Sequence, residues 1–427
     1  MMHVLRWPLR VVKWGLDACA GILVCLVACV LARRNKSAAT GQVHALFIVP
    51  GANVESIYRK FGTLDVYFSD NPDFFHKVER LLLGRGNFTL HLKDNFIVTE
   101  RNTDNTRFPL LGHARILLAA IRIARLEPVS IIHARSPYQP GLIGVAASWL
   151  LGAPLCISIH SDYEKREALQ AGTIPRILGS VWLSRRAERF CYAHATRVLP
   201  IRESMVPHIE GVGCPPSKIR LWPHGVNLTA FTLPAEESVR DHFGLPEDAR
   251  IISSVGRLVD ENYAYDLLDI CKAVVAMRPD TYCLICGTGE REESMRQAVQ
   301  QAGLGERILL PGNVPLKLSY EIRKQSDVNL SLMGGFSLIE ACAGGKPAIA
   351  YDVEWHYELV KNDETGLLAP EHAVDLVIER IIHYLDNPQL AALHGEAGKA
   401  LAFARHDSRI VKQHRAAVYQ EVLDEYR

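Results

Sequence analysis

The sequence predicts an α/β protein with two doubly wound domains, each built on a parallel sheet, and a separate apolar helix at the N-terminus. Two observations predict the sheets: short apolar runs alternate with amphipathic helical segments, and this alternation begins twice along the 427 residues. A long apolar run near residue 20 predicts the helix. Hydrophobic residues make up 48% of the chain, which is ordinary for a globular protein and sufficient for two cores.

The N-terminal helix is predicted from residues 14–32, which are apolar apart from Asp17. Basic residues flank this run on both sides: Arg6, Arg10, Lys13, Arg33, Arg34 and Lys36. A helix of this length extends about 28 Å, close to the hydrocarbon thickness of a bilayer. We therefore expect residues 1–36 to be an uncleaved membrane anchor, with a signal peptide or a buried helix as the alternatives. The flanking charges leave its orientation open.

The first domain is expected at residues 43–231. Its predicted elements are strands at 43–50, 129–134 and 154–160, helices at 109–126 and 141–152, and a hairpin within 87–100. Strands that alternate with helices at this spacing are typical of a parallel sheet.

The second domain is expected at residues 232–405, after a charged, Pro-bearing connection at 231–250. Its predicted strands are 250–256, 281–287, 307–312, 326–332 and 346–351, each followed by a helical pattern. Ligands of such sheets bind beyond the carboxyl ends of the strands, so two facing sheets would hold a substrate in the cleft between the domains. A last helix at 406–427 is long enough to return toward the first domain.

The composition excludes two classes of function. The net charge is +1, whereas a nucleic-acid-binding protein usually carries a large basic excess. The ten cysteines are scattered and indicate no disulfide framework, which fits a reducing compartment. Cys283 and Cys286 form a C-x-x-C, but strand alternation would place them on opposite faces of the sheet. We therefore interpret them as free buried thiols rather than as a redox or metal site.

Two loops at strand ends of the second domain carry the residue types of a phosphate site. Gly256 permits a tight turn, and the Arg257 that follows it could hold a diphosphate with two parallel hydrogen bonds, although a surface arginine is the simpler interpretation. Gly287 and Gly289 lie between a strand and a helix, where a phosphate could approach the helix N-terminus. A simple tight turn explains them equally well.

A third loop, at 333–347, contains Gly334 and Gly335 before a helix whose start holds Ser337 and Glu340. Free amides at that N-terminus suit a phosphate, and the carboxylate of Glu340 could accept hydrogen bonds from ribose hydroxyls. The alternative is a capping box made by Ser337 and Glu340.

Several weaker candidates lie at other strand ends. His160 follows a first-domain strand and would face the cleft, and His224 lies in the hinge-like turn PHGVNLTAF. Three acids, Asp352, Glu354 and Glu358, lie just beyond a second-domain strand, where a solvated helix start is the simpler interpretation.

Taken in order, the motifs SIHSDY, PHGVNLTAF, SVGRL, CGTGE, LPGNV and SLIEACAGGKPAIAYD resemble glycosyltransferase family 4, the retaining enzymes of the GT-B fold. The similarity covers roughly residues 129–400. It implies two Rossmann-like domains that face one another across a cleft and a nucleotide-diphosphate sugar as donor substrate. It implies no metal, no further cofactor and no protein nucleophile.

The resemblance also implies roles for single residues. Arg257 would hold the diphosphate, Glu340 would hold the ribose, and His160 would lie beside the transferred sugar. The remaining implied donor contacts come from Gly287, Gly289, Val314, Gly334, Gly335, Phe336 and Ser337, with Val314 near the base and the amides near Gly335 on the distal phosphate.

Two positions depart from the family pattern. Asn262 stands where the family usually has a lysine, and Leu332 stands where it has a second glutamate eight residues before the one that matches Glu340. Asp352 or Glu354 is a candidate replacement for the missing carboxylate.

The sequence thus predicts a retaining hexosyltransferase that uses a UDP- or GDP-sugar and acts on a lipid-linked or envelope glycan, anchored to the membrane with its catalytic domains facing the cytoplasm. The helix at 107–126 carries Arg115, Arg122 and Arg125 and could lie on anionic lipid, although a plain core helix fits its pattern too. A catalytically degenerate protein that binds glycan or nucleotide-sugar, or scaffolds another enzyme, is the main alternative. A nucleotide-sugar epimerase is a third.

Overall fold

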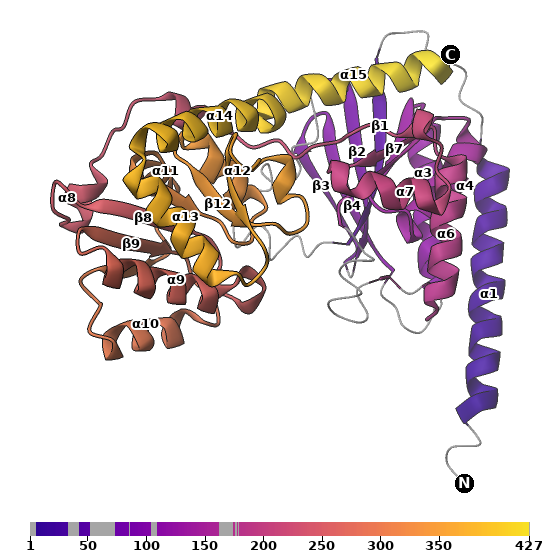
Figure 1. The fold of residues 1–427 in the computed structure, drawn as a ribbon. Coiled ribbons are helices and arrows are strands. Elements are labelled where there is room, and N and C mark those ends of the chain that lie inside the picture. Colours follow the sequence, from indigo (N-terminus) through magenta and orange to yellow (C-terminus); the bar gives the residue numbers. More distant parts are fainter. Residues whose placement is uncertain are drawn as a thin grey trace. The chain divides into compact units, whose positions relative to one another are not determined.

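The computed structural model describes residues 6–32, 42–51, 73–84, 86–103, 109–161, 174–175, 177 and 179–426, with only the backbone of residues 6–15. The chain divides into two compact units (Figure 1). The first contains Met1–Trp222 and Gln413–Arg427, and the second contains Pro223–Lys412. The second unit thus begins ahead of the connection that the sequence suggested at 231–250, and His224 belongs to the second unit.

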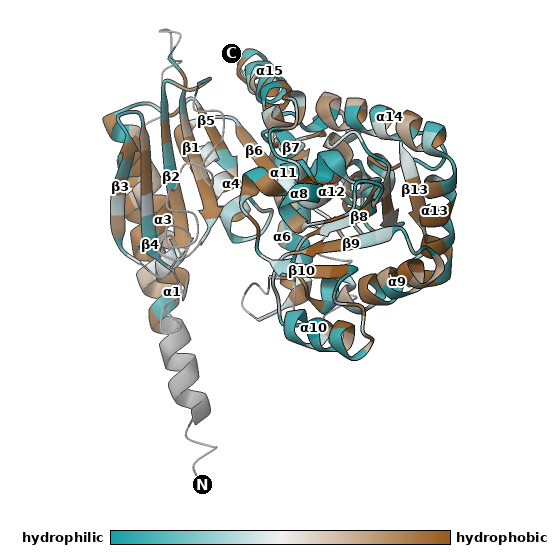
Figure 2. Cartoon of the chain, turned by 90° about the vertical axis from the view of Figure 1, so that its left-hand side faces the viewer, coloured by the Kyte–Doolittle hydropathy of each residue, from teal (hydrophilic) through white to brown (hydrophobic). Residues whose placement is uncertain are grey.

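The first unit contains, within its described residues, a seven-stranded sheet in the order β3-β4-β2-β1-β5-β6-β7. Its strands are β1 (His44–Pro50), β2 (Lys77–Gly84), β3 (Phe88–Lys93), β4 (Phe96–Asn102), β5 (Ile131–Ala134), β6 (Leu155–Ile159) and β7 (Arg197–Pro200). All pairs are parallel except β3 with β4, which form the predicted hairpin. The central strands β1, β5 and β6 are apolar and buried (Figure 2), whereas the edge strand β3 is mostly exposed.

Among the residues that the structure describes, one face of this sheet is covered by α3 (Pro109–Leu126), α4 (Gln139–Leu151) and α6 (Val181–His194). The connections from β4 to β5, β5 to β6 and β6 to β7 advance in one direction across the sheet, so right-handed crossovers place their helices on the same face. A short helix, α7 (Val206–Val212), follows β7.

The N-terminal helix α1 (Arg6–Leu31) lies along α3. The buried carboxylate of Asp17 accepts hydrogen bonds from the amides of Leu110 and Leu111, both at 3.0 Å, and thereby caps the N-terminus of α3. Within the described residues no helix has both the length and the hydropathy needed to cross a membrane, so the predicted transmembrane helix at 1–36 is not supported. Asp17, the one acid in the apolar run, instead ties α1 to the folded unit.

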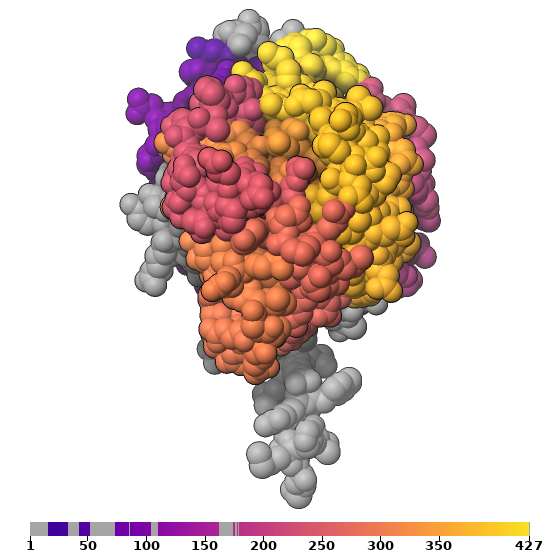
Figure 3. Space-filling model, turned by 60° about the vertical axis from the view of Figure 1, so that its left-hand side comes forward, coloured from indigo at the N-terminus to yellow at the C-terminus, as the bar shows by residue number. Residues whose placement is uncertain are grey.

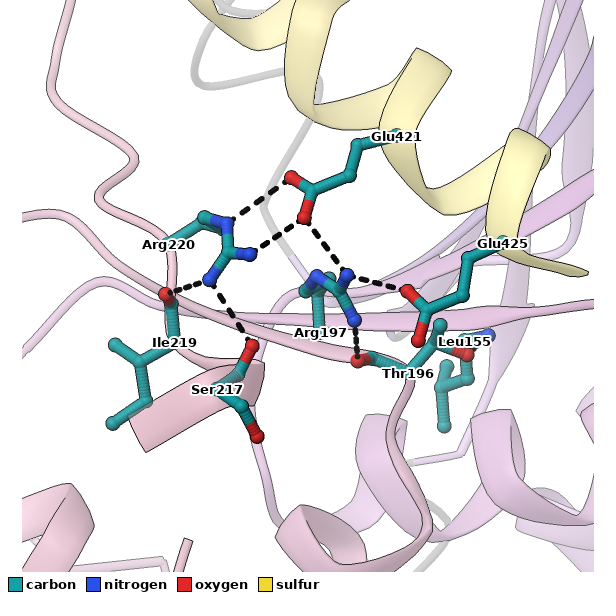
Figure 4. Close-up of polar contacts among 8 residues, drawn as sticks. All are labelled: Leu155, Thr196, Arg197, Ser217, Ile219, Arg220, Glu421 and Glu425. Atoms are coloured by element: carbon teal, nitrogen blue, oxygen red, sulfur yellow. Dashed lines mark hydrogen bonds and ion pairs between the residues drawn. The ribbon is translucent and has the colours of Figure 1, made fainter. Parts of the chain in front are cut away.

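The last helix, α15 (Ser408–Tyr426), begins in the second unit, and its end belongs to the first. In the first unit the hydroxyl of Tyr419 lies 2.6 Å from Nδ1 of the buried His133. Glu421 accepts hydrogen bonds from Arg197 at 2.8 Å and from Arg220 at 2.6 and 3.1 Å, as Figure 4 shows. These contacts attach the C-terminal helix to the rim of the first sheet.

The second unit contains, within its described residues, a six-stranded parallel sheet in the order β10-β9-β8-β11-β12-β13. Its strands are β8 (Arg250–Val255), β9 (Thr281–Cys286), β10 (Ile308–Gly312), β11 (Val328–Leu330), β12 (Ala348–Tyr351) and β13 (Gly366–Ala369). From β8 the chain winds outward in one direction, and from β11 it winds outward in the other. This reversal is the doubly wound arrangement that the sequence predicted.

The helices of the second unit are α8 (Val239–Phe243), α9 (Ala264–Met277), α10 (Glu292–Gln301), α11 (Leu316–Gln325), α12 (Phe336–Ala343), α13 (Val374–Asp386) and α14 (Pro388–His406). In Figure 3 the gold and yellow residues of α13 and α14 form one continuous flank of this unit. Cys283 and Cys286 belong to different core clusters, as strand alternation predicted, and both are free thiols.

The cap on α3 can be tested with Asp17→Asn. The amide keeps the size of the side chain but loses the charge that favours a helix N-terminus, so we expect the unfolding free energy to fall by about 1 kcal/mol. Urea unfolding followed by circular dichroism measures this. Asp94→Asn, in the exposed β3–β4 turn, is the matched control. Equal stability of the two variants would contradict the capping role.

The attachment of α15 should depend on pH. Hydrogen bonds from Arg220 and Arg197 hold the pKa of Glu421 below its usual range, so the contribution of this carboxylate is present at neutral pH and is lost as the pH falls through its folded-state pKa. Glu421→Gln should speed hydrogen exchange in residues 413–426 at pH 7. The free energy of local opening should fall by about 1 kcal/mol or less, because solvent screens this partly exposed carboxylate. The difference from wild type should vanish in acid, and a difference that persists there would contradict this account.

Candidate functional site

The topology of the second unit identifies where a ligand is expected. β8 and β11 are neighbours at the centre of the sheet, and the winding direction reverses between them. In open α/β sheets the crevice beyond the carboxyl ends of two such strands is the usual ligand site. The loop that follows β8 contains Gly256 and Arg257, and the loop that follows β11 contains Gly334 and Gly335. The predicted donor-binding loops therefore flank the switch point.

The loops after β8 and β9 pack backbone against backbone. The amide of Gly256 donates to the carbonyl of Cys286, and that of Leu258 donates to Thr288, both at 3.0 Å. A Cβ at Gly287, whose φ is +138°, would lie 1.8 Å from the Gly256 carbonyl oxygen. A Cβ at Gly289 would lie 2.1 Å from the carbonyl oxygen of Leu258. Both glycines are thus required for loop packing, and a contact with donor remains a prediction.

Arg257 has an exposed side chain that makes no hydrogen bond or ion pair within the described part of the chain. Its main chain is held by Asn262, whose Nδ2 donates to the Arg257 carbonyl oxygen at 3.1 Å. Asn262 stands where a lysine was expected. Here it fixes the loop instead of supplying a charge, and the guanidinium of Arg257 is left available to an anion.

The start of α12 offers backbone amides without a side-chain cap. Gly335 is the N-cap residue, and no side chain bonds to the first turn. The alternative of a capping box is therefore wrong, because Ser337 lies inside the helix and cannot cap it. A Cβ at Gly335 would meet no atom within 4 Å, so the space before the helix is open. The amides near Phe336 and Ser337 can bind an anion there.

The glycine loop before α12 is held by His356, a residue that the sequence analysis did not select. Its ring is fully buried, and Nδ1 lies 2.8 Å from the carbonyl oxygen of Tyr351. Nε2 lies 3.1 Å from the amide nitrogen of Gly334 and 3.2 Å from the carbonyl oxygen of the same residue. The ring therefore ties the end of β12 to the loop before α12. A Cβ at Gly334 would lie 2.4 Å from Ser331 Oγ, so this loop also requires glycine.

Glu340 on α12 is oriented by a buried arginine. Its Oε2 lies 3.1 Å from a guanidinium nitrogen of Arg323 on α11, whose side chain is only 3% exposed. The same nitrogen donates to the Val255 carbonyl oxygen at the end of β8. Burial raises the pKa of Glu340, and the charge of Arg323 opposes this shift. The second carboxylate oxygen, Oε1, has no partner among the described residues and can accept from a ligand.

The remaining second-unit candidates lie around this edge. Val314 is half-buried just after β10, and Asp352 is exposed after β12. Leu332 is 3% exposed within the core, so no carboxylate occupies the position where the second glutamate was expected. His224 packs its ring against that of Phe336, with 5.2 Å between centroids, which places it beside the start of α12. Glu354 adopts a left-handed backbone with a φ of +50°.

The first unit has a smaller polar site at the carboxyl ends of β5 and β6, next to its own switch point between β1 and β5. His160 follows β6, and Arg135, which the sequence analysis missed, follows the neighbouring β5. Arg135 Nε donates to His160 Nε2 at 3.2 Å, and Ser158 Oγ lies 2.9 Å from the same nitrogen. Because an arginine can only donate, Nε2 is the accepting nitrogen of His160. The sequence signal that could have identified Arg135 is its position directly after a buried strand.

A cavity of about 580 Å³ lies elsewhere in the second unit. Its lining includes Arg250, Asp327 and Lys346, which stand at the amino ends of β8, β11 and β12. Lys324 and Lys399 also line it. This cavity is at the edge of the sheet opposite the glycine loops. Within the described residues no group of three or more His, Cys, Asp or Glu side chains could hold a metal ion.

Comparison with known families decides the identity. Residues 235–401 match the family described as Glycosyl transferases group 1, and residues 70–230 match Glycosyltransferase Family 4. The chain belongs to glycosyltransferase family 4. Two curated members of similar sequence are UDP-Gal:alpha-D-GlcNAc-diphosphoundecaprenol alpha-1,3-galactosyltransferase of Escherichia coli and phosphatidyl-myo-inositol mannosyltransferase of Mycobacterium leprae. The first is 26% identical and covers 66% of this chain and 73% of its own length. The second is 25% identical and covers 68% and 73%.

Solved structures agree on the fold of this glycosyltransferase. Sucrose-phosphate synthase from Thermosynechococcus elongatus has a TM-score of 0.65 at 18% identity, covering 90% of this chain and all of its own. Anabaena Alr3699/HepE in complex with UDP has a TM-score of 0.66 at 16% identity, covering 89% and 100%. The fold is therefore GT-B, with two Rossmann-like parallel sheets, as the resemblance implied.

The role of His356 can be tested with His356→Leu. The substitution leaves the Gly334 amide without this partner and removes one of the hydrogen bonds to the Tyr351 carbonyl oxygen, which still accepts from the amide of Val353. Leaving a buried amide unpaired costs about 1–3 kcal/mol, so chemical denaturation should show a loss of about that size. His356→Gln, which keeps one donor and one acceptor, should lose less. Equal losses for the two variants would show that ring packing, rather than hydrogen bonding, is what His356 contributes.

Proposed function

We propose that the protein is a retaining hexosyltransferase that moves a sugar from a UDP- or GDP-sugar to a lipid-linked or envelope glycan acceptor. The observation that carries this proposal is the edge of the second sheet at its switch point. Among the described residues, the Arg257 side chain and Glu340 Oε1 have no partner there, and the start of α12 has no side-chain cap. Cations and free amides suit a diphosphate, and a carboxylate oxygen suits ribose hydroxyls.

In this proposal Arg257 and the first amides of α12 hold the donor diphosphate, and Glu340 Oε1 accepts from the ribose. Asn262 supplies no charge. The amides near Gly335 therefore contribute more to diphosphate binding than they would if a lysine stood at residue 262. Further donor contacts are assigned to Gly287, Gly289, Val314, Gly334, Phe336 and Ser337. Arg323 and His356 act indirectly, because they hold Glu340 and Gly334 in place.

The proposed chemistry is electrostatic and needs no metal or further cofactor. The bond between the anomeric carbon and the diphosphate oxygen breaks, and fixed N–H groups stabilise the negative charge that develops on the leaving diphosphate. The acceptor oxygen bonds to the anomeric carbon on the face from which the diphosphate leaves, and a leaving phosphate oxygen takes the proton of the acceptor hydroxyl. Because the new bond forms on the same face as the broken one, the configuration is retained. His160, held by Arg135 and Ser158, is proposed to lie beside the transferred sugar.

The lipid-linked acceptor and the location are supported by two further observations. The names of the two relatives given above contain a diphosphoundecaprenol and a phosphatidyl-myo-inositol acceptor. From residue 16 onward, where the structure describes the side chains of α1, the exposed sides of this helix are mainly apolar. We propose that the protein is held at a membrane through its N-terminal segment, with both sheets on the cytoplasmic side where nucleotide-sugars are made.

A panel of UDP- and GDP-sugars tests the proposal. The full-length protein in membranes should release nucleoside diphosphate from one donor when a lipid-linked acceptor is present. Measurable donor binding without release from any donor would favour the degenerate alternative, to which Leu332 and Asn262 point.

Glu340→Ala tests the ribose contact. We expect donor affinity to fall about 10- to 150-fold, because a charge-assisted hydrogen bond of about 1.5–3 kcal/mol is lost. Isothermal titration measures the change. Glu364→Ala, an exposed acid in the loop before β13, is the control. Donor affinity as high in Glu340→Ala as in the control would refute the assigned role.

A further inference from the structure

Four helices of the first unit form one outer layer, which we define as α1, α3, α4 and α6. They contact one another in this order, and Figure 1 shows them together on one side of the first sheet. Exposed arginines lie along two of these helices: Arg115, Arg122 and Arg125 on α3, and Arg186 and Arg189 on α6.

The same layer presents no carboxylate, as far as the structure describes these four helices. α3 and α4 contain neither aspartate nor glutamate. Glu188 of α6 is 3% exposed and accepts from the Tyr192 hydroxyl at 2.8 Å, and Asp17 of α1 is 1% exposed and caps α3. Glu127, which follows α3, pairs with Lys77 at 3.2 Å. The layer is thus positive although the whole chain is almost neutral.

Aromatic side chains accompany these arginines. Trp182, Arg186, Phe190 and His194 recur every fourth residue on α6 and so form one stripe along the helix. Arg186 lies over the Trp182 ring, 5.0 Å from its centroid. Trp149 of α4 extends the stripe, with its ring centroid 5.8 Å from that of Phe190. Trp182 is 62% exposed and Trp149 is 56% exposed.

The described part of α1 adds an aliphatic surface. A narrow stripe that includes Asp17, Gly21 and Ala28 is buried. The exposed sides carry Leu16, Ile22, Leu23, Leu26, Val27 and Val30, which are 41–84% exposed. A helix that is apolar on nearly all sides is stable only in apolar surroundings, and an exposed apolar patch of this kind marks a contact surface.

Aliphatic side chains, half-exposed tryptophans and exposed arginines together match the layers of a lipid leaflet: acyl chains, headgroup boundary and phosphates. We propose that the outer layer is the surface on which this protein lies on a bilayer that contains anionic lipid. The exposed sides of α1 enter the acyl region, Trp149 and Trp182 lie at headgroup level, and the arginines of α3 and α6 face lipid phosphates. This deepens the proposed function by naming the surface that meets the lipid.

A nucleic acid would also attract arginines and aromatic rings, but the aliphatic surface of α1 offers nothing to it. A protein partner would need a complementary acidic and apolar face. A lipid leaflet alone matches the aliphatic residues of α1, the tryptophans and the arginines.

Vesicle flotation of the full-length protein tests the proposal with two sets of substitutions. One set replaces Trp149 and Trp182 by alanine, and the other replaces Arg122, Arg125 and Arg186 by glutamine. Vesicles of phosphatidylcholine alone are compared with vesicles that also contain phosphatidylglycerol. The control set is Met277→Ala with Leu393→Ala, two exposed apolar residues of the second unit.

Wild type should bind the anionic vesicles more tightly, and salt should weaken this binding. The arginine set should lose the anionic preference, by about fivefold for each charge. The tryptophan set should weaken binding to both kinds of vesicle, and the control set should behave as wild type. The proposal is overturned if both sets bind like the control, or if the arginine set loses affinity for single-stranded RNA and keeps its affinity for vesicles.

Thermal shift with the donor, measured on the same variants, separates this inference from the proposed function. Both sets should keep donor binding, since none of their residues lies in the second unit. If wild type binds vesicles but releases no nucleoside diphosphate, the membrane surface is supported and the proposed function is wrong. If wild type releases nucleoside diphosphate but binds no vesicles, the proposed function is supported and the membrane surface is wrong.

Discussion

The backbones of Gly256 and Gly287 approach one another so closely that no side chain fits between them, and the geometry of the second unit's edge depends on this contact. The ladder of β8 and β9 continues beyond the strands into the two loops, through the amides of Gly256 and Leu258. A side chain at residue 287 would meet a backbone oxygen rather than a flexible group, so the loops could not keep this arrangement. Arg257 is presented from the segment that this contact fixes.

Buried polar groups hold the other half of the same edge. His356 bonds to the loop before α12 with one nitrogen and to the end of β12 with the other. Arg323 reaches from α11 to both Glu340 and the end of β8. Groups fixed in this way need little rearrangement when charge develops on a bound ligand, which is the condition for electrostatic catalysis. The arrangement is coherent even though one expected lysine and one expected glutamate are absent.

Much of the fold could be predicted from the sequence because parallel strands that are buried on both faces leave continuous apolar runs. The β3–β4 hairpin and the opposite faces of Cys283 and Cys286 followed from alternation alone. The same logic selected Arg257 and the glycines of the predicted donor site, since residues directly after a strand lie at its carboxyl end, whereas Val314 and Phe336 were selected only through the family resemblance. Signals of this kind are local, because residues that are neighbours in the sequence define them.

The features that could not be predicted are made by contacts between distant segments. His356, Arg323 and Arg135 have the local patterns of ordinary core or surface residues, and only their partners 22, 68 and 25 positions away reveal them. Asp17 appears in the sequence only as the one acid of an apolar run, whereas it caps a helix that begins more than ninety residues later. The capping box failed because α12 begins one residue before Ser337.

Hydrogen exchange of the full-length protein with and without a nucleoside diphosphate tests the central claim most directly. If the carboxyl edge of the second sheet is the donor site, amides at 256–258, 287–289 and 334–340 should become protected, and the β8, β11 and β12 amino ends should not change. Protection confined to the cavity lined by Arg250, Lys346 and Lys399 would contradict the account, because that cavity lies at the opposite edge of the sheet.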